Sequence, residues 1–487
     1  MTMLNTSNLK VKDLRFINDI KSMAVIGASK KRNFFFLRNH AENFKGKLYA
    51  VNPEVKEIPG FDKNNIYPSL KEIPGDVDFV FIAVPPSKIL EVMDECSEKG
   101  VKLATVFTAE FSDSGTEEGL ELEKEVLKRA QNKVRILGPN GLGLYYPKLG
   151  IAWRSHFPAK SGTINFIAQS GGICNLVIYS ANVLGINFSK VFSFGNGADV
   201  DFVDILYFMI NDPETNIILC YLEGIKSERG EALKKVFEYN NRKNKKPIVI
   251  VRGGKTKTGS FAAKTHTASI SGENHIWKAI FEQYNIIEVN SIEQLLATAV
   301  LIENYGVFET KNLAVLSSSG GYGVILVDLI EKLGIKIPPF SPNIQKQISS
   351  NFFTLGTSSK NPLDVSAQVF SGESVYKIMD LALSDENIDG LIVDLPSFYF
   401  NSDYSFRITI DHSYEDKIIE ALTLGHKYKK PLIPIIKRIN CPEDRDRLFR
   451  KLTNEKVPIF EDPIEFIPLL PKISQYTRKK NLHRKNT

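Results

Sequence analysis

His266 lies in a segment, Gly253 to Gly272, that is unusually rich in Gly, Ser, Thr, Ala and Lys. Because no bulky side chain shields it, we expect a histidine on a long, exposed loop between two strands. Imidazole nitrogen is a good nucleophile near neutral pH, and two different phosphoryl partners can reach an exposed one. His266 is therefore a candidate phosphoryl carrier, although an isolated loop histidine is more often an inert surface residue.

Glu223 is the candidate partner of this histidine. It follows an apolar run in the sequence YLEGI at 221–225, at the predicted carboxyl end of a strand. A buried carboxylate there can hold one imidazole N–H, which fixes the tautomer and stabilises the charge of a phosphorylated ring. Without that contact, Glu223 would be an ordinary solvated residue.

A second group of candidate residues, Gln169, Ser170, Gly171 and Gly172, separates an apolar strand from an apolar helix. Backbone amides at the start of that helix favour an anion, so the segment predicts a phosphate cradle. A serine at such a turn also suggests a hydrolase nucleophile. The flanking sequence is QSGG and not GxSxG, which favours the cradle.

Near the N-terminus, the sequence VIGAS at 25–29 is a weaker nucleotide signal, because the full GxGxxG pattern is absent. Gly27 would let the backbone approach a phosphate, and Ser29 can cap the following helix. Lys30 adds positive charge at the same place, together with the two basic residues after it.

Further strand ends punctuated by proline follow in the same region. If the sheet is doubly wound, they converge on the edge that carries Gly27. Such a groove suits an extended ligand with a nucleotide end and a pantetheine arm, although well-made turns would look the same. The candidate binding residues at these ends are Asn52, Pro53, Val84, Pro85 and Asn140.

The elements that position these residues follow an α/β pattern. From Ser22, short apolar runs alternate with segments of helical period, which predicts a parallel sheet with helical crossovers. A second series begins after Ser161 and a third near Lys311, so 487 residues form about three domains. The third series repeats the passage from strand to Ser-Gly-Gly to apolar helix, for which a shared fold is a better explanation than a second working anion site.

Composition excludes several classes of function. A net charge of +6 is spread along the chain, which does not indicate nucleic acid binding, and no window is apolar enough for a membrane span. Four scattered cysteines lack metal-ligand spacing, so we predict no metal site in this chain and a reduced, cytoplasmic location. The basic residues of 471–487 read as a solvated tail.

The motifs together resemble the alpha subunit of acetate–CoA ligase (ADP-forming), an NDP-forming acyl-CoA synthetase of the succinyl-CoA synthetase superfamily. The resemblance runs from about Ser22 to Leu470. The motifs that carry it are VIGAS at 25–29, YAVNP at 49–53, YPSL at 67–70, GPNGLG at 138–143, AQSGG at 168–172, FGNGADVD at 194–201, DPET at 212–215, YLEGI at 221–225, KTHTASISG at 264–272, SGGYGVILVD at 319–328 and NPLDV at 361–365.

The resemblance implies an α/β fold of three domains and a tail. A Rossmann-like, coenzyme-A-binding domain at 12–150 precedes two flavodoxin-like, parallel-sheet domains of the succinyl-CoA synthetase type at 160–306 and 310–470. It also implies that His266 is transiently phosphorylated, that Glu223 supports it, and that Ser170 to Gly172 cradle phosphate. Acyl-CoA and phosphate would give acyl phosphate and CoA, His266 would take the phosphoryl group, and ADP would receive it.

The same resemblance implies a partner. The ATP-grasp domains of the family, which hold ADP or ATP and Mg²⁺, have no counterpart in this chain. We therefore expect a separate ATP-grasp beta subunit, in an α2β2 arrangement, and no acyl-CoA synthesis by this chain alone.

Several positions depart from the family pattern. Thr265 and Ala268 flank the histidine where Ser and Gly are usual, and a run of Phe at 34–36 follows the first turn. Gly141 replaces a usual Cys or Thr, and EFSD at 110–113 replaces GF-x-E. Two alternatives stay open: a catalytically silent regulatory protein that binds CoA or acyl-CoA, and a nicotinamide-dependent oxidoreductase.

Overall fold

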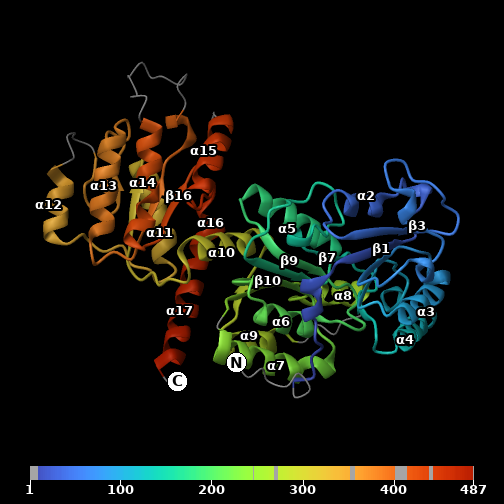
Figure 1. Ribbon diagram of the computed structural model, residues 1–487. Helices are drawn as coiled ribbons and strands as arrows, with labels where there is room; N and C mark the ends of the chain where they lie inside the picture. The colour runs from blue at the N-terminus through green and yellow to red at the C-terminus, as the bar shows by residue number, and fades with distance from the viewer. Residues whose placement is uncertain are drawn as a thin grey trace. The chain divides into compact units, whose positions relative to one another are not determined.

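The computed structural model describes residues 9–244, 246–267, 273–350, 357–400, 414–437 and 442–485. Side chains are described over the same ranges except at 244, 263–267, 398, 442 and 483–485. The chain divides into two compact units, Met1–Ile292 and Glu293–Thr487. The first unit contains two six-stranded sheets and the second a four-stranded sheet (Figure 1).

The first sheet is parallel and doubly wound, with the strand order β3-β2-β1-β4-β5-β6. The chain direction along the sheet reverses between β1 and β4, and ligands bind at the carboxyl ends on either side of such a reversal. The strands are β1 (Ser22–Ile26), β2 (Lys47–Val51), β3 (Ile66–Tyr67), β4 (Phe79–Ile82), β5 (Leu103–Val106) and β6 (Arg135–Leu137).

Helices cover both faces of this sheet. Helix α2 (Phe35–Ala41) lies on one side, and α3 (Ile89–Lys99) and α4 (Glu117–Ala130) lie together on the other (Figure 1). Successive residues of a strand point to opposite faces, so Met23 and Val25 join one core while Ala24 and Ile26 join the other. The fully buried strands explain why each is an uninterrupted apolar run in the sequence.

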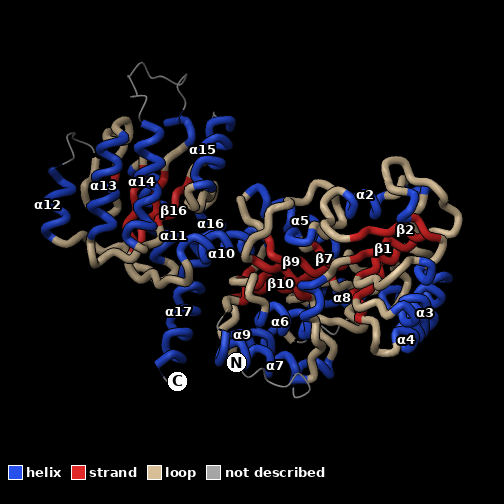
Figure 2. The backbone as a smooth tube through the Cα atoms, in the orientation of Figure 1, coloured by secondary structure: helices blue, strands red, loops and turns tan. Residues whose placement is uncertain are grey.

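The second sheet has the flavodoxin-like order β12-β11-β10-β8-β9, with an antiparallel edge strand β7 beside β9 (Figure 2). Its strands are β7 (Gly143–Tyr145), β8 (Ile164–Ala168), β9 (Phe188–Ser193), β10 (Ile217–Leu222), β11 (Ile248–Arg252) and β12 (Ile287–Val289). Its helices are α5 (Gly171–Val183), α6 (Phe202–Asn211), α7 (Gly230–Tyr239), α8 (Lys257–Thr267) and α9 (Asn274–Gln283).

One hydrophobic core joins the two sheets of the first unit. Phe81 of β4, Leu144 of β7 and Phe192 of β9 belong to the same cluster of buried side chains. Strand β7 begins three residues after Asn140, at the end of the first sheet's last loop, and pairs with the second sheet. The carboxyl ends of both sheets are therefore held in a fixed relation, although the sequence suggested two separate domains.

The third sheet, in the second unit, has the order β14-β13-β15-β16, which matches β9-β8-β10-β11 of the second sheet. This match confirms that the third series shares the fold of the second. Its strands are β13 (Leu313–Ser317), β14 (Leu363–Asp364), β15 (Gly390–Asp394) and β16 (Leu432–Ile435). Its helices are α10 (Ile292–Tyr305), α11 (Gly320–Glu331), α12 (Pro342–Ser350), α13 (Gly372–Ser384), α14 (Tyr414–Tyr428), α15 (Pro442–Asn454), α16 (Pro463–Phe466) and α17 (Leu470–Lys485).

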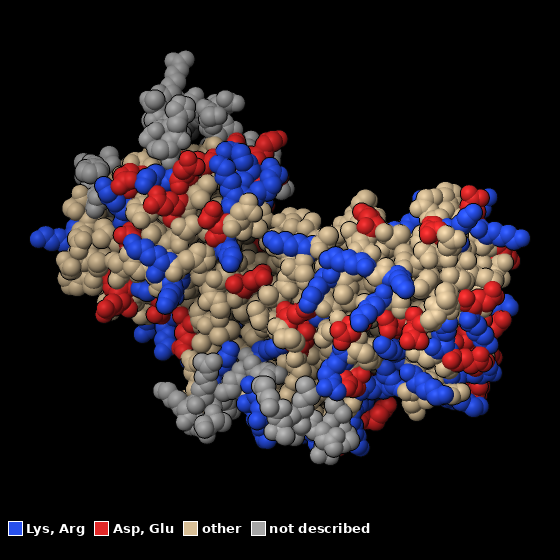
Figure 3. Space-filling view, viewed as in Figure 1, with Lys and Arg blue, Asp and Glu red and all other residues tan. Residues whose placement is uncertain are grey.

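Helix α17 contains most of the segment that we expected to be a solvated basic tail. Its first half is packed into the second unit, where Ile473 and Tyr476 are buried and the Ser474 hydroxyl accepts a hydrogen bond from the Thr310 N–H at 2.9 Å. The basic residues follow this buried half. Over both units, Lys and Arg are interspersed with Asp and Glu on the face seen in Figure 3.

His40 is a buried histidine in α2. It is 1% exposed, neither ring nitrogen has a hydrogen-bond partner among the described residues, and its ring centroid lies 5.4 Å from that of Phe81. Burial lowers the pKa of His40 to about 3. In the unfolded chain the pKa of His40 is ~6.5. Between these two pKa values, the unfolded chain therefore binds a proton at His40 that the folded protein does not bind.

We therefore expect the free energy of unfolding to fall as the pH falls from about 6.5 towards 3, with a slope from His40 of about 1.4 kcal/mol per pH unit. Urea unfolding at pH 7 and pH 5 measures this loss, which for His40 alone is about 2 kcal/mol at pH 5. His40→Leu should remove that part of the slope. An unchanged difference between the two pH values in the variant would contradict the assignment.

Candidate active site

A pocket of about 1330 Å³ lies at the carboxyl ends of the strands in the first unit. Loops of the first sheet and the turn before α5 line it together. The pocket thus contains seven of the eight binding residues predicted in the first domain and all four of the predicted phosphate cradle. These are Gly27, Ser29, Asn52, Pro53, Val84, Pro85, Asn140, Gln169, Ser170, Gly171 and Gly172.

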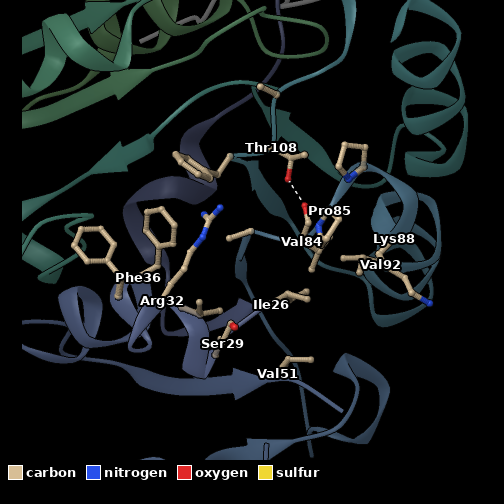
Figure 4. A pocket seen from close by; sticks show the side chains of 18 of the residues that line it. Ile26, Ser29, Arg32, Phe36, Val51, Val84, Pro85, Lys88, Val92 and Thr108 are labelled. Carbon is tan, nitrogen blue, oxygen red and sulfur yellow. Dashed lines mark hydrogen bonds between the residues drawn. The ribbon is translucent and has the colours of Figure 1, made fainter. Parts of the chain in front are cut away.

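Hydrogen bonds between neighbouring strand ends fix the first wall. The Asn52 amide donates to the Ala28 carbonyl at 2.8 Å, which ties the end of β2 to the turn after β1. The Thr108 hydroxyl donates to the Val84 carbonyl at 2.6 Å and ties β5 to β4 (Figure 4). Each predicted turn is thus held by the next one along the edge of the sheet.

Positive charge enters the pocket beside Gly27, but not from the predicted lysine. Lys31 and Arg32 line the pocket, whereas Lys30 is exposed and does not. The reason is a short 3-10 turn at 30–32, capped by the Ser29 hydroxyl, which accepts from the Lys31 N–H at 3.2 Å. In Figure 4, Arg32 and Phe36 lie on one side of the pocket and Lys88 and Val92 on the other.

Gly27 has φ +92°, and a Cβ there would lie 2.5 Å from the Ala83 carbonyl oxygen. We expect Gly27→Ala to force the ends of β1 and β4 apart and to weaken CoA binding about tenfold or more, as measured by titration calorimetry on the isolated chain. Gly60→Ala is the matched control, because Gly60 has φ +77° but open space around it. Equal affinity in the Gly27 variant would show that this turn does not contact the ligand.

The second wall is the turn before α5. Ser170 is the residue before the first helical residue, Gly171, and its hydroxyl accepts from the Ile173 N–H at 3.4 Å. Gly172 is exposed, and a Cβ there would meet nothing closer than the Ser170 hydroxyl at 3.8 Å. The start of this 13-residue helix is therefore open to a ligand, and its free N–H groups favour an anion.

Gln169 links this turn to the predicted acid, Glu223. Its side-chain carbonyl accepts from the backbone N–H of Glu223 at 2.6 Å and of Gly224 at 3.2 Å. Gln169 and Glu223 are each 6% exposed. A buried amide that satisfies two backbone donors fixes the distance between the phosphate turn and the end of β10.

Glu223 directly follows β10, as the sequence predicted, and its side chain is buried. The Tyr221 hydroxyl donates to its carboxylate at 3.0 Å, and burial together with this charge raises the pKa of Tyr221. The loop that leads to α8 passes close by, because a Cβ at Gly253 would lie 3.3 Å from the Glu223 Cγ. Glu223 therefore contacts the phosphate turn through its backbone N–H, and its side chain lies beside the loop that leads to α8.

The segment with His266 was expected to be a loop, and the structure corrects this for residues 257–267, which form helix α8. The Thr256 hydroxyl caps it, accepting from the Gly259 N–H at 3.0 Å. Helix α8 contacts the turn Ser112–Ser114, which belongs to the first sheet's loops. The side chains of Thr265 and His266, and the whole of Ala268, lie outside the described residues.

Comparison with known proteins identifies the parts. Residues 21–147 match a family described as a CoA binding domain, and residues 161–302 match a succinyl-CoA ligase like flavodoxin domain. The chain is 35% identical over 378 residues to the acetate–CoA ligase [ADP-forming] II subunit alpha of Pyrococcus furiosus, which covers 76% of this chain and 80% of the relative.

The chain belongs to the family of ADP-forming acetate–CoA ligases. A second alpha subunit of P. furiosus, of acetate–CoA ligase [ADP-forming] I, is 29% identical over 95% of this chain and 98% of its own length. A dinucleotide forming acetyl-coenzyme A synthetase 1 of Ca. Korarchaeum cryptofilum, solved with phosphate and ADP, has a TM-score of 0.82 at 29% identity, covering 97% of this chain and 99% of the other.

Other ligases of the family are longer. The chain spans about half the length of the relatives from Methanocaldococcus jannaschii and Archaeoglobus fulgidus, at 49% and 53% of their residues. The predicted fold, a Rossmann-like domain and flavodoxin-like domains, is confirmed. Membership of a CoA ligase family replaces the alternative of a nicotinamide-dependent oxidoreductase. No helix in the described part of the chain has the length and hydropathy to cross a membrane.

Some residues of this CoA ligase pocket were not predicted. Asn196 lies in the motif FGNGADVD, which marked the region without singling out a residue, and Asn175 lies one turn into α5. Phe107 reaches the pocket from the end of β5, where its ring centroid lies 4.7 Å from that of Phe36, which belongs to the Phe run that the sequence did single out. Helical period and strand order give no signal for side chains that meet only through the packing of α2 on the sheet.

Proposed function

We propose that this chain is the CoA-binding, phosphohistidine-carrying alpha subunit of an ADP-forming acyl-CoA synthetase. The overall reaction converts acyl-CoA, phosphate and ADP into carboxylic acid, CoA and ATP, and it is reversible. His266 carries the phosphoryl group and Glu223 positions it. The observation that supports this proposal best is the pocket, which joins the strand ends of the CoA binding domain to the turn Gln169–Gly172.

The pocket suits CoA in volume and lining. Its 1330 Å³ accommodate an extended ligand, Lys31 and Arg32 offer positive charge to phosphates, and the walls near Phe36 and Val84 are apolar. CoA supplies the thiol that forms the thioester. The chain's own contribution is to hold that thiol near the start of α5, where the N–H groups can bind inorganic phosphate.

The proposed reaction has three steps. Phosphate oxygen attacks the thioester carbonyl, the carbon–sulfur bond breaks, and CoA leaves as its thiol from the acyl phosphate. One imidazole nitrogen of His266 then attacks phosphorus, and the carboxylate leaves. Glu223 accepts a hydrogen bond from the other imidazole nitrogen, which keeps the attacking nitrogen unprotonated. ADP finally takes the phosphoryl group from His266, so the chemistry depends mainly on positioning and charge.

We also propose a separate partner with ATP-grasp domains that binds ADP or ATP and Mg²⁺, in an α2β2 assembly. Two relatives bear the name subunit alpha, and others are about twice as long as this chain. We propose that the partner corresponds to the part of the longer relatives that this chain does not match. Three buried cysteines, Cys96, Cys174 and Cys220, are free thiols, which supports a cytoplasmic location.

Relatives act on different acids by name. Beside the acetate–CoA ligases, one at 30% identity is the 4-hydroxybutyrate–CoA ligase [ADP-forming] of Nitrosopumilus maritimus, and one at 25% is a trans-feruloyl-CoA synthase. Family membership therefore leaves the acid open, and we propose a carboxylic acid without naming one.

The experiment that tests the proposal detects phosphorylation of His266. The purified chain, alone and with the ATP-grasp subunit, is incubated with acetyl phosphate labelled in phosphorus and with Mg²⁺. We expect a label that is stable to base and labile to acid, located by mass spectrometry in the peptide that contains His266. Absence of label under every condition, while CoA still binds, would contradict the proposal and favour the silent regulatory protein.

A further inference from the structure

Glu110 has a backbone conformation that suits glycine. Its φ is +78°, in the left-handed region that a residue with a side chain rarely adopts. It follows the end of β5 by four positions, and its side chain is exposed and lines the pocket. A strained residue at the wall of a ligand pocket persists when the surrounding structure holds it, and such residues cluster at functional sites.

A network of hydrogen bonds holds this turn. The Asp113 carboxylate accepts from the backbone N–H groups of Glu110 at 3.2 Å and Phe111 at 3.1 Å. The Asn196 amide then donates to the Asp113 carboxylate at 2.8 Å and to the Glu123 carboxylate at 3.1 Å. Asn196 belongs to the second sheet's loops, so the turn that presents Glu110 is fixed from both sides of the pocket.

Glu110 lies at the end of the pocket where, under the proposed function, the phosphoryl group is transferred to His266. The turn Ser112–Ser114, two residues further on, contacts α8, the helix that carries His266. Asn196, which holds Glu110's turn, lines the pocket along with Ser170 of the phosphate cradle. An acyl group that lies between the CoA thiol and bound phosphate is therefore near Glu110.

Glu110 is also the charged residue among the described residues that line this wall; the Asp113 and Glu123 carboxylates do not line the pocket, and both accept from the Asn196 amide. The other described residues of this wall, at 107–109, 140–142, 169–172, 175 and 195–196, are all uncharged. The Glu110 backbone N–H donates to Asp113, but the Glu110 carboxylate makes no hydrogen bond or ion pair with another described residue. A carboxylate on a fixed turn repels a second carboxylate on the substrate and tolerates a methyl group or a hydrogen-bond donor.

We propose that Glu110 determines which acids are used, by excluding dicarboxylic acids and admitting monocarboxylic ones. This inference rests on the proposed function, because it requires the acyl group to be activated in this pocket. It deepens that function by naming a residue that selects among acids. A side chain with this role explains why residue 110 is a glutamate, although its backbone conformation favours glycine.

The test compares butyrate with succinate, which have four carbons each and differ in a methyl group against a carboxylate. The chain is assembled with its ATP-grasp partner, and acyl-CoA formation from each acid gives kcat/KM. Glu110→Gln keeps the size and the backbone strain but removes the charge, and Glu110→Asp keeps the charge. Glu118→Gln, exposed on α4, is the matched control for loss of one negative charge.

We expect the ratio of succinate to butyrate kcat/KM to rise roughly tenfold to a hundredfold in Glu110→Gln, and to stay near the wild-type ratio in the Asp and control variants. A ratio within twofold of wild type in Glu110→Gln would overturn the inference, as would efficient use of succinate by the wild type. Phosphorylation of His266 in the wild type is measured beside it. Absence of that label would overturn the proposed function and this inference with it, whereas label with an unchanged ratio would overturn this inference alone.

Discussion

His266→Ala is expected to take up no label from acetyl phosphate and to reduce acyl-CoA formation by the assembled enzyme to background. Alanine offers no nitrogen to carry the phosphoryl group between the pocket and the partner's nucleotide. The affinity of the variant for CoA is measured as well, by titration calorimetry. Its retention would show that the chain is folded, because the CoA pocket belongs to the same compact unit as α8.

Glu223→Gln is a second variant, for which we expect a partial loss of labelling. Glutamine keeps the size of the buried side chain and can still accept from the Tyr221 hydroxyl, now 3.0 Å from the carboxylate. It lacks the charge that stabilises an imidazolium or phosphohistidine, so we expect the labelling rate to fall about a hundredfold. Its readout is the rate of labelling with CoA affinity unchanged, which separates positioning from folding.

Label that persists in His266→Ala would move the carrier to another residue and contradict the proposal. A Glu223→Gln variant that labels at the wild-type rate would leave His266 as carrier and remove Glu223 from its support. In that case the buried carboxylate would have a structural role, through the hydrogen bond that it accepts from the Tyr221 hydroxyl at 3.0 Å.

The sequence predicted which residues meet at one edge of the first sheet, because one rule of parallel sheets applies to all of them. Gly27, Asn52, Val84 and Asn140 each follow a buried apolar run, and the carboxyl ends of parallel strands meet at one edge. No contact between distant residues had to be foreseen. The same rule brought Ser170 to the edge of the second sheet, next to them.

What the sequence did not predict depends on a local turn and on tertiary packing. Lys30 and Lys31 are equivalent in type, and a 3-10 turn decides that Lys31 lines the pocket and Lys30 does not. The segment at 257–267 is rich in residues of low helix propensity, yet it forms α8, since the Thr256 cap and contact with the turn Ser112–Ser114 outweigh propensity.

The union of the first two domains was also invisible in the sequence. Separate apolar series predict separate cores, and only the packing of Phe81, Leu144 and Phe192 shows one core. Its consequence is functional, because a pocket with walls from both sheets needs those sheets fixed in place. The domain boundaries at 12–150 and 160–306 stay a prediction from the sequence.

The motif DPET at 212–215 carries no residue of the pocket, and the structure explains it through Lys190 of β9. This lysine is fully buried, and its ammonium lies 3.0 Å from the Asp212 carboxylate and 2.9 Å from that of Glu214. The ammonium is also 4.3 Å from the ring centroid of Tyr146, whose hydroxyl donates to Glu214 at 2.8 Å. Burial opposes ionisation of Glu214, but hydrogen bonds from Lys148, Lys190 and Tyr146 lower its pKa to about 2.

Lys190→Met is expected to lower the free energy of unfolding by about 3 to 5 kcal/mol, because it leaves Asp212 as a buried carboxylate without its cation. The midpoint of urea unfolding at pH 7 measures this loss. Lys148→Met is the control: that lysine also pairs with Glu214 but is 58% exposed, so its loss should cost less than about 1 kcal/mol.

Adding Asp212→Leu to Lys190→Met tests the cause, because removing both charges should recover much of the lost stability if an unpaired carboxylate is responsible. Equal effects of Lys190→Met and Lys148→Met would contradict the assignment. The network lies at the amino end of β10, away from the pocket, so the folded fraction of Lys190→Met should still label on His266. DPET then marks a requirement for folding the second sheet, whereas QSGG and YLEGI mark its chemistry.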